Sequence, residues 1–125
     1  MAQTVIENIK GKPHVIGVYD CNLMMLDHAG FDITKIEPFS SGLQGRRNIK
    51  KATGCKNYDE FLIKHGFSKI NPMFVSDGCI LRRGVHFFIF NNGYLFGLHP
   101  NKKVFDFFKI DYKHYDNFEV YQKWA

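Results

Sequence analysis

A chain of 125 residues is long enough for one domain and should bury about two thirds of the surface that its unfolded form exposes. A hydrophobic fraction of 45% with 16% aromatic residues excludes a disordered polar chain and favours a tightly packed, sheet-rich interior. Seventeen Lys and Arg against twelve Asp and Glu give a net charge of +5, which favours anionic partners such as nucleic acid, acidic lipids or anionic wall polymers.

The cysteines are odd in number and show no CxxC spacing, which disfavours a disulfide framework and a structural zinc site. No apolar stretch reaches the roughly eighteen residues needed for a bilayer span, and the N-terminus has no signal-peptide core. We therefore expect no membrane span and synthesis in a reducing cytoplasm.

The first half of the chain is predicted to be mostly helical. Residues 3–10 place apolar side chains at helical spacing. After an extended approach over 15–19, Asp20 stands at the N-cap of a helix over 21–29 that is apolar nearly all round, which is typical of a buried helix. Residues 40–53 predict a weak, exposed helix or a loop, and 57–65 a better helix that Asn57 caps.

The second half changes to short runs rich in aromatic and β-branched residues. Asn91-Asn92-Gly93 between two such runs predicts a tight hairpin, because Asn and Gly tolerate positive φ. The expected strands of an antiparallel meander are 79–81, 85–90, 94–98, 104–110 and, less regularly, 118–121. The fold class is therefore α+β, a single domain over 1–125 with N-terminal helices packed on a C-terminal antiparallel sheet.

Three residues form a constellation that indicates chemistry. A cysteine hydrolase needs a thiolate, an imidazole that takes and returns a proton, and a third polar group that orients the imidazole. Cys21 opens a helix, where amide dipoles favour an anion, while His86 begins one strand and His99 ends the next. A hairpin centred near Asn92 places the two histidines roughly opposite each other. Cys55 and Cys79 are interpreted as packing residues.

These residues, in this order and spacing, resemble the NlpC-type cysteine peptidases, a papain-like family of cell-wall hydrolases. The short, divergent members found among bacteriophage tail genes are the nearest in character. The matching segments are Gly11-Lys12-Pro13-His14, Gly17, Asp20-Cys21, Ser76-Asp77-Gly78-Cys79-Ile80-Leu81 and His86-Phe87-Phe88-Ile89-Phe90-Asn91-Asn92-Gly93.

The resemblance implies a papain-like core and acyl transfer, with Cys21 as nucleophile, His86 as general base and His99 as the orienting third member. It implies a peptide bond of the peptidoglycan stem as substrate, no cofactor or metal, and His14, Tyr19 and Asp20 as substrate-binding residues. Asn22-Leu23 stands where the family has Ser-Gly, and His14 stands in place of a tyrosine.

Those departures favour a second hypothesis, in which a catalytically degraded domain of the same fold serves as a phage tail or virion component or as an assembly factor. The protein would then be incorporated in a virion, whereas the enzyme would be delivered to the cell wall. A zinc site at Cys21, His86 and His99 is a chemically possible alternative. Nucleic-acid binding through Arg46–Lys51 is disfavoured against a solvated basic face.

Overall fold

The computed structural model describes residues 2–124 and is an α+β fold with a six-stranded antiparallel sheet. The helices are α1 (Ala2–Ile9), α2 (Cys21–His28), α3 (Gly42–Thr53) and α4 (Tyr58–Lys64), with 3-10 turns η1 (Ile33–Lys35), η2 (Pro72–Phe74) and η3 (Tyr112–Asn117). The strands are β1 (Phe67–Ile70), β2 (Ile80–Arg83), β3 (His86–Asn91), β4 (Tyr94–Leu98), β5 (Phe105–Phe108) and β6 (Glu119–Lys123).

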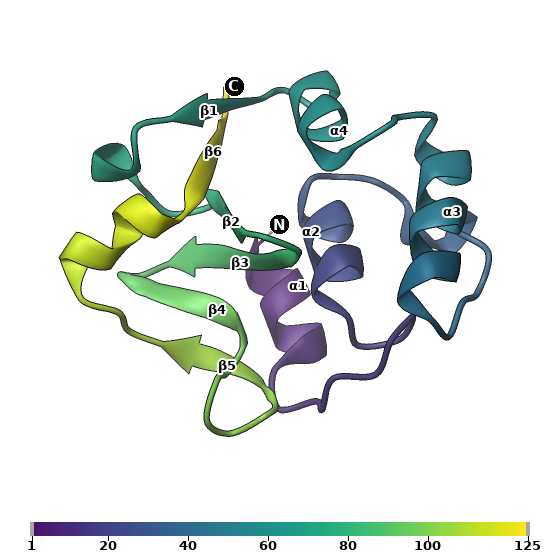
Figure 1. Cartoon of the computed structure of the whole chain (residues 1–125). Coiled ribbons are helices and arrows are strands. Elements are labelled where there is room, and N and C mark those ends of the chain that lie inside the picture. Colours follow the sequence, from purple (N-terminus) through teal and green to yellow (C-terminus); the bar gives the residue numbers. More distant parts are fainter. Residues whose placement is uncertain (1, 125) are drawn as a thin grey trace.

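The sheet has the strand order β1-β6-β2-β3-β4-β5 (Figure 1). Strands β2 to β5 follow one another as the predicted antiparallel meander. The last strand departs from it, because β6 returns to the opposite side and lies between β1 and β2. The sequence did not predict β1, whose four residues pair only with β6.

Both faces of the sheet are covered, which explains the uninterrupted aromatic runs. On β3, Phe87 and Ile89 belong to the cluster that packs under α1 and α2. Phe88 and Phe90 alternate onto the other face, where they pack against a second cluster that includes Phe118. The α helices therefore lie on one side of the sheet, and the segment around η3 lies on the other.

The helix boundaries follow local capping signals. Asp20 and Asn57 cap α2 and α4 as predicted, each accepting a hydrogen bond from a first-turn amide. The segment 40–53 forms a helix of twelve residues rather than a loop. Ser41 caps its start, and Gly54 ends it in the left-handed conformation, so capping stabilises α3 although few of its side chains are buried.

The predicted hairpin is confirmed. Asn92 and Gly93 form a two-residue turn with φ values of 54° and 82°, the positive values that a type I′ turn requires. The expected extended run over 15–19 is instead a tight turn, closed by an antiparallel bridge between Val15 and Tyr19.

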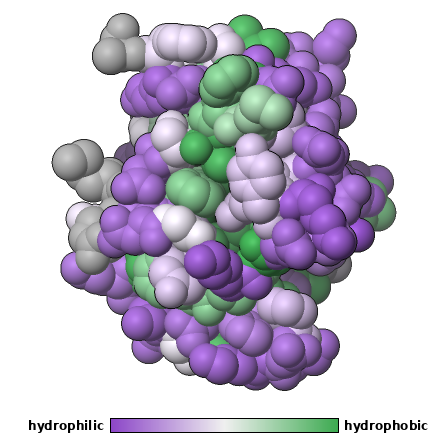
Figure 2. Space-filling view, turned by 90° about the vertical axis from the view of Figure 1, so that its left-hand side faces the viewer, coloured by the Kyte–Doolittle hydropathy of each residue, from purple (hydrophilic) through white to green (hydrophobic). Residues whose placement is uncertain are grey.

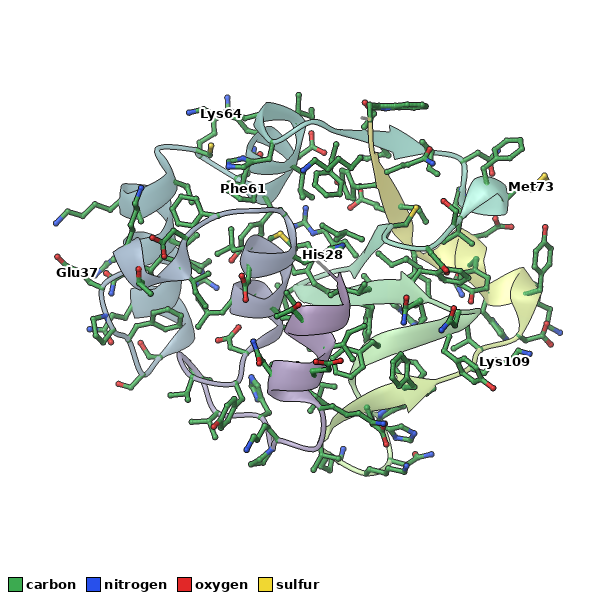
Figure 3. The ribbon with its side chains drawn as sticks, turned by 180° about the vertical axis from the view of Figure 1, so that it is seen from behind. His28, Glu37, Phe61, Lys64, Met73 and Lys109 are labelled. Carbon is green, nitrogen blue, oxygen red and sulfur yellow. The ribbon has the colours of Figure 1, made fainter. Side chains whose placement is uncertain are left out.

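Apolar side chains are exposed at the end of the molecule where η2 and η3 lie. Figure 2 shows hydrophobic atoms running down the middle of that face between polar flanks. Met73, Phe74 and Tyr112 are exposed there, and Met73 projects outward in Figure 3. No helix within residues 2–124 has the length and apolar character to cross a bilayer.

Candidate functional site

Asp20 fixes the start of α2 and thereby the position of Cys21. Its Oδ1 accepts hydrogen bonds from the backbone amide of Asn22 at 2.8 Å and from that residue's side-chain amide at 3.1 Å. Its Oδ2 accepts one from the backbone amide of Gly17 at 3.1 Å. Gly17 has a φ of 81°, and a Cβ there would collide with the carbonyl group of Phe39. The buried carboxylate of Asp20 thus joins the turn before α2 to its first residues.

The thiol of Cys21 lies at the junction between α2 and β3. The residue is 8% exposed, and Sγ donates to the carbonyl oxygen of Val85 at 3.8 Å. The pKa of Cys21 is raised from 9.0 to about 11, chiefly by burial and in part by the Asp20 carboxylate, while hydrogen bonds from the backbone of Phe87 and of Cys21 itself oppose the rise. The thiol is therefore protonated near neutral pH, and it contacts the backbone on both sides of His86.

Two cavities meet at Cys21. One, of about 240 Å³, is lined by Cys21 together with both predicted histidines, His86 and His99. The other, of about 210 Å³, is lined by Cys21, His86, His14 and Asp20 among others. The fold thus brings the three members of the predicted constellation to the wall of one cavity.

The two histidines are not hydrogen-bonded to each other or to the thiol in the described part of the chain. Continuing the register of β3 and β4 sets His86 opposite His99, as predicted. The Nδ1 atom of His99, however, accepts the backbone amides of Asn101 and Lys102 at 3.1 and 3.2 Å. The proton of a neutral His99 is then on Nε2, so this ring presents a donor to the cavity's other groups.

Strand alternation explains the separation. The ring of His99 packs edge-on against Phe108, with 5.6 Å between centroids, and Phe108 packs on the cluster remote from α2. His86 shares the parity of Phe88, which packs on that same cluster. The thiol and the imidazoles therefore approach from opposite faces of the sheet, and what they share is the wall of the cavity of 240 Å³. His86 is exposed there, and its side chain makes no hydrogen bond within residues 2–124.

The predicted substrate-binding residues have different environments. His14 is exposed and lines the cavity of 210 Å³. Tyr19 is half-buried against the main core, and the ammonium group of Lys12 lies 5.6 Å from its ring centroid. Asp20 lines the cavity, but three hydrogen bonds already engage its carboxylate. Of the three, His14 has the side chain most available to a ligand.

Tyr58 is a site residue that the sequence did not reveal. It lies at the first position of α4, lines the same cavity as Cys21, and packs edge-on against Phe87 with 5.0 Å between centroids. Burial raises the pKa of Tyr58 to about 12, with Asp20 and Cys21 adding to the rise. Its hydroxyl therefore stays protonated and can donate. Only the packing of α4 against β3 brings it here, so no local pattern could have marked it.

Cys55 and Cys79 are buried, in agreement with their interpretation as packing residues. Among residues 2–124 no group of three or more His, Cys, Asp and Glu side chains is arranged to hold a metal ion. Comparison with protein-family models, with curated proteins and with solved structures finds no significant match for this chain.

Proposed function

We propose that this protein is a thiol-dependent hydrolase with a papain-like, NlpC-type core, in which Cys21 is the nucleophile and His86 the general base. The observation that carries the proposal is the shared cavity: a cysteine at the capped start of a buried helix lines one cavity together with His86 of β3 and His99, which directly follows β4. A thiol and an imidazole at a common cavity are the minimal parts of acyl transfer.

The reaction follows from these groups. The Cys21 sulfur attacks an amide carbonyl carbon while its proton passes to His86, forming a C–S bond. His86 returns that proton to the leaving amine as the C–N bond breaks. Water then attacks the thioester, giving its proton to His86, and the thiol is released protonated.

Donors for the oxyanion lie at the start of α2. The first-turn amides of a helix have no intrahelical acceptor, and Cys21 and Leu23 belong to this turn. The protonated hydroxyl of Tyr58 borders the same space. Together they provide dipoles beside the sulfur, which is where the negative charge develops.

The proposed reaction requires the His86 side chain to turn toward the sulfur. Because this imidazole is exposed, turning it toward the sulfur breaks no hydrogen bond of the described chain. Catalytic hydrogen bonds in ligand-free active sites are often long and shorten only when substrate is bound. The raised pKa of Cys21 means that the thiol is deprotonated during attack rather than beforehand. The substrate suggested by the family resemblance is a peptide bond of the peptidoglycan stem.

The test is hydrolysis of purified, dye-labelled peptidoglycan and of its soluble stem peptides. We expect Cys21→Ala to abolish product release and His86→Ala to lower the rate by about 10²- to 10⁴-fold. Cys55→Ala, at another buried cysteine, is the matched control and should retain activity. Circular dichroism establishes that each variant folds. Equal activity of the Cys21→Ala and wild-type proteins would refute the proposal.

A second candidate is the binding module: the same domain without catalysis, serving as a phage tail or virion component. The two hydrogen bonds that His99 Nδ1 accepts from backbone amides favour this candidate. With Nδ1 engaged and the proton on Nε2, the His99 ring has no free acceptor for a hydrogen bond from the His86 ring, so it cannot orient that ring as a third catalytic member. This candidate predicts no hydrolysis by the wild-type protein and no effect of Cys21→Ala on partner binding.

A further inference from the structure

A basic cleft of about 380 Å³ lies beside the cavities at Cys21. We define it by the five cationic side chains that line it: Arg46, Arg47, Lys50, Lys56 and Arg82. None of the described residues on its wall is an aspartate or glutamate. The volume is within the range of about 300–1,000 Å³ that is typical of ligand pockets.

The cations come from three separate segments of the chain. Leu43, Arg46 and Lys50 follow one another at helical spacing, so one face of α3 forms a wall of the cleft. Lys56 lies between α3 and α4, and Arg82 lies on β2. The fold therefore gathers like charges that the chain could have kept apart, which costs energy unless an anion lies between them.

Internal ion pairs leave most of this charge uncompensated. Within residues 2–124, the four cations other than Arg82 form no ion pair. Arg82 is 4.0 Å from a carboxylate oxygen of Glu119, whose other oxygen is only 2.7 Å from Lys69. The neighbouring Lys51, outside the cleft, is the one α3 cation with a carboxylate partner in that part of the chain, Glu37.

The cleft is apolar beneath its charges. Ile49 and Phe61 are buried in its wall, and the guanidinium carbon of Arg82 lies 6.0 Å from the ring centroid of Tyr58. Figure 3 shows Phe61 on the inner side of α4 and Lys64 on its outer side. Buried Phe61 offers no face on which a nucleobase could stack, and the half-buried ring of Tyr58 lies beside the Arg82 guanidinium. The combination suits a carboxylate-bearing peptide better than a single-stranded nucleic acid.

The basic cleft continues into the candidate catalytic site. Arg46, Tyr58 and Val85 line both the cleft and the cavity of 210 Å³ that contains Cys21. An extended ligand that occupies the cleft can therefore reach the thiol without leaving the groove. One carboxylate is matched bidentately by one guanidinium, so five cations call for two or more acidic groups.

We infer that the basic cleft binds an acidic stretch of a polypeptide carrying at least two carboxylates, and that it holds the adjoining residues of that polypeptide over Cys21. The second part deepens the hydrolase proposal and rests on it. The first part, recognition of the acidic stretch, stands without catalysis.

The test measures binding to the Cys21→Ala protein, which cannot cleave its ligand. The probe is the fluorescein-labelled hexapeptide Gly-Leu-Glu-Glu-Leu-Gly, and its partner peptide has Gln in place of each Glu. By fluorescence anisotropy at low salt, we expect the Gln peptide to bind at least tenfold more weakly. When Arg46→Gln or Arg82→Gln is introduced as a second substitution into the Cys21→Ala protein, each should weaken binding of the Glu peptide about fivefold or more.

Arg83→Gln is the matched control, because Arg83 neighbours Arg82 on β2 but lies over Phe118 on the other face of the sheet. It should change the affinity by less than about twofold. Arg46 is exposed, so its variant remains informative if Arg82→Gln disturbs packing. Equal binding of the two peptides, an equal effect of Arg83→Gln, or tighter binding of a six-nucleotide oligothymidylate would overturn the inference.

Hydrolysis is measured separately with the wild-type protein and the same two peptides. Selective binding of the Glu peptide without cleavage would refute cleavage of this acidic substrate, including the placement of adjoining residues over Cys21, and leave the recognition site standing. Cleavage of stem peptides without selective binding of the Glu peptide would support the hydrolase proposal and refute the acidic recognition site.

Discussion

The two ends of α2 both carry a titratable side chain with a displaced pKa, buried Cys21 and half-buried His28, but the cavities described above are lined by Cys21 alone of the two. Cys21 at the N-terminal end lines two cavities that also reach His86. At the C-terminal end, His28 donates from Nε2 to the carbonyl of Gly78 at 2.8 Å, and its buried Nδ1 has no partner within residues 2–124. Figure 3 places His28 near the middle of the molecule.

Burial favours the neutral form at both ends. It raises the pKa of Cys21 and lowers that of His28. The comparison teaches that a displaced pKa alone does not mark a functional group. What distinguishes Cys21 is its access to a cavity with a second proton carrier, whereas His28 ties α2 to the turn before β2.

The largest expected effect tests the glycines that flank the helix. Gly17 and Gly30 both have positive φ, but only at Gly17 would a Cβ meet backbone, that of Phe39. We expect Gly17→Ala to lower the free energy of unfolding by about 3–5 kcal/mol and Gly30→Ala by about 1–2 kcal/mol. Urea denaturation measures both. Equal losses would show that the N-terminal turn is no more constrained than the C-terminal one.

The next effect is loss of stability in alkali. Because the pKa of Cys21 is about 11 in the folded protein against 9.0 unfolded, the unfolded state loses the proton first. The contribution of the protonated Cys21 thiol to the free energy of unfolding is complete below pH 9. It is lost as pH rises to 11, by up to about 2.7 kcal/mol. Urea denaturation under reducing conditions should show this loss in the wild type relative to Cys21→Ser. Parallel curves for the two proteins would contradict the burial of the thiol.

A smaller change is expected in acid, from the other end of the helix. The pKa of His28 lies below its ordinary 6.5, chiefly through burial, with the Gly78 carbonyl opposing the shift. Its stabilising contribution is therefore present above pH 6.5 and declines as pH falls through the lower folded value. Thermal unfolding between pH 7.5 and 5 should show that His28→Gln removes this decline. A decline that persists unchanged would assign it to other groups.

The smallest expected effect tests how far the Asp20 carboxylate contributes to the raised pKa of the Cys21 thiol. The Asp20 carboxylate contributes to the raised pKa of Cys21, so Asp20→Asn should increase the thiolate fraction. We expect alkylation of Cys21 by iodoacetamide at pH 8 to become a few-fold faster, as followed by mass spectrometry. Asp27→Asn, near the other end of α2, is the control. Slower alkylation in Asp20→Asn would mean that the cap matters to the sulfur only through its geometry.

Local signals predicted the elements that local interactions build. The Asp20 cap, the Asn57 cap and the Asn92-Gly93 turn each involve neighbours in sequence, and each is present. Strand β1 was missed because its alternation is short and its partner β6 is remote in sequence. Helix α3 was left open between helix and loop because its apolar positions are few.

The candidate site, like the fold, could be predicted only where neighbours in sequence determine it. The hairpin register that sets His86 opposite His99 follows from a two-residue turn. The face on which those rings lie depends on packing against Phe108, which the pattern does not encode. The basic side chains at 46–51 were assigned to a solvated face, and only the placement of Arg82 and Tyr58 reveals the cleft that three of them line.

The position of β6 inside the sheet has a consequence for synthesis on the ribosome. The meander from β2 to β5 can form as its strands emerge, but the edge of β2 stays unpaired and β1 has no neighbour until residues 119–123 arrive. An open strand edge in a nascent chain is a template for intermolecular pairing. Any truncation or stalling before the last strand therefore leaves an aggregation-prone intermediate, and a chaperone that shields β2 would raise the yield of folded protein.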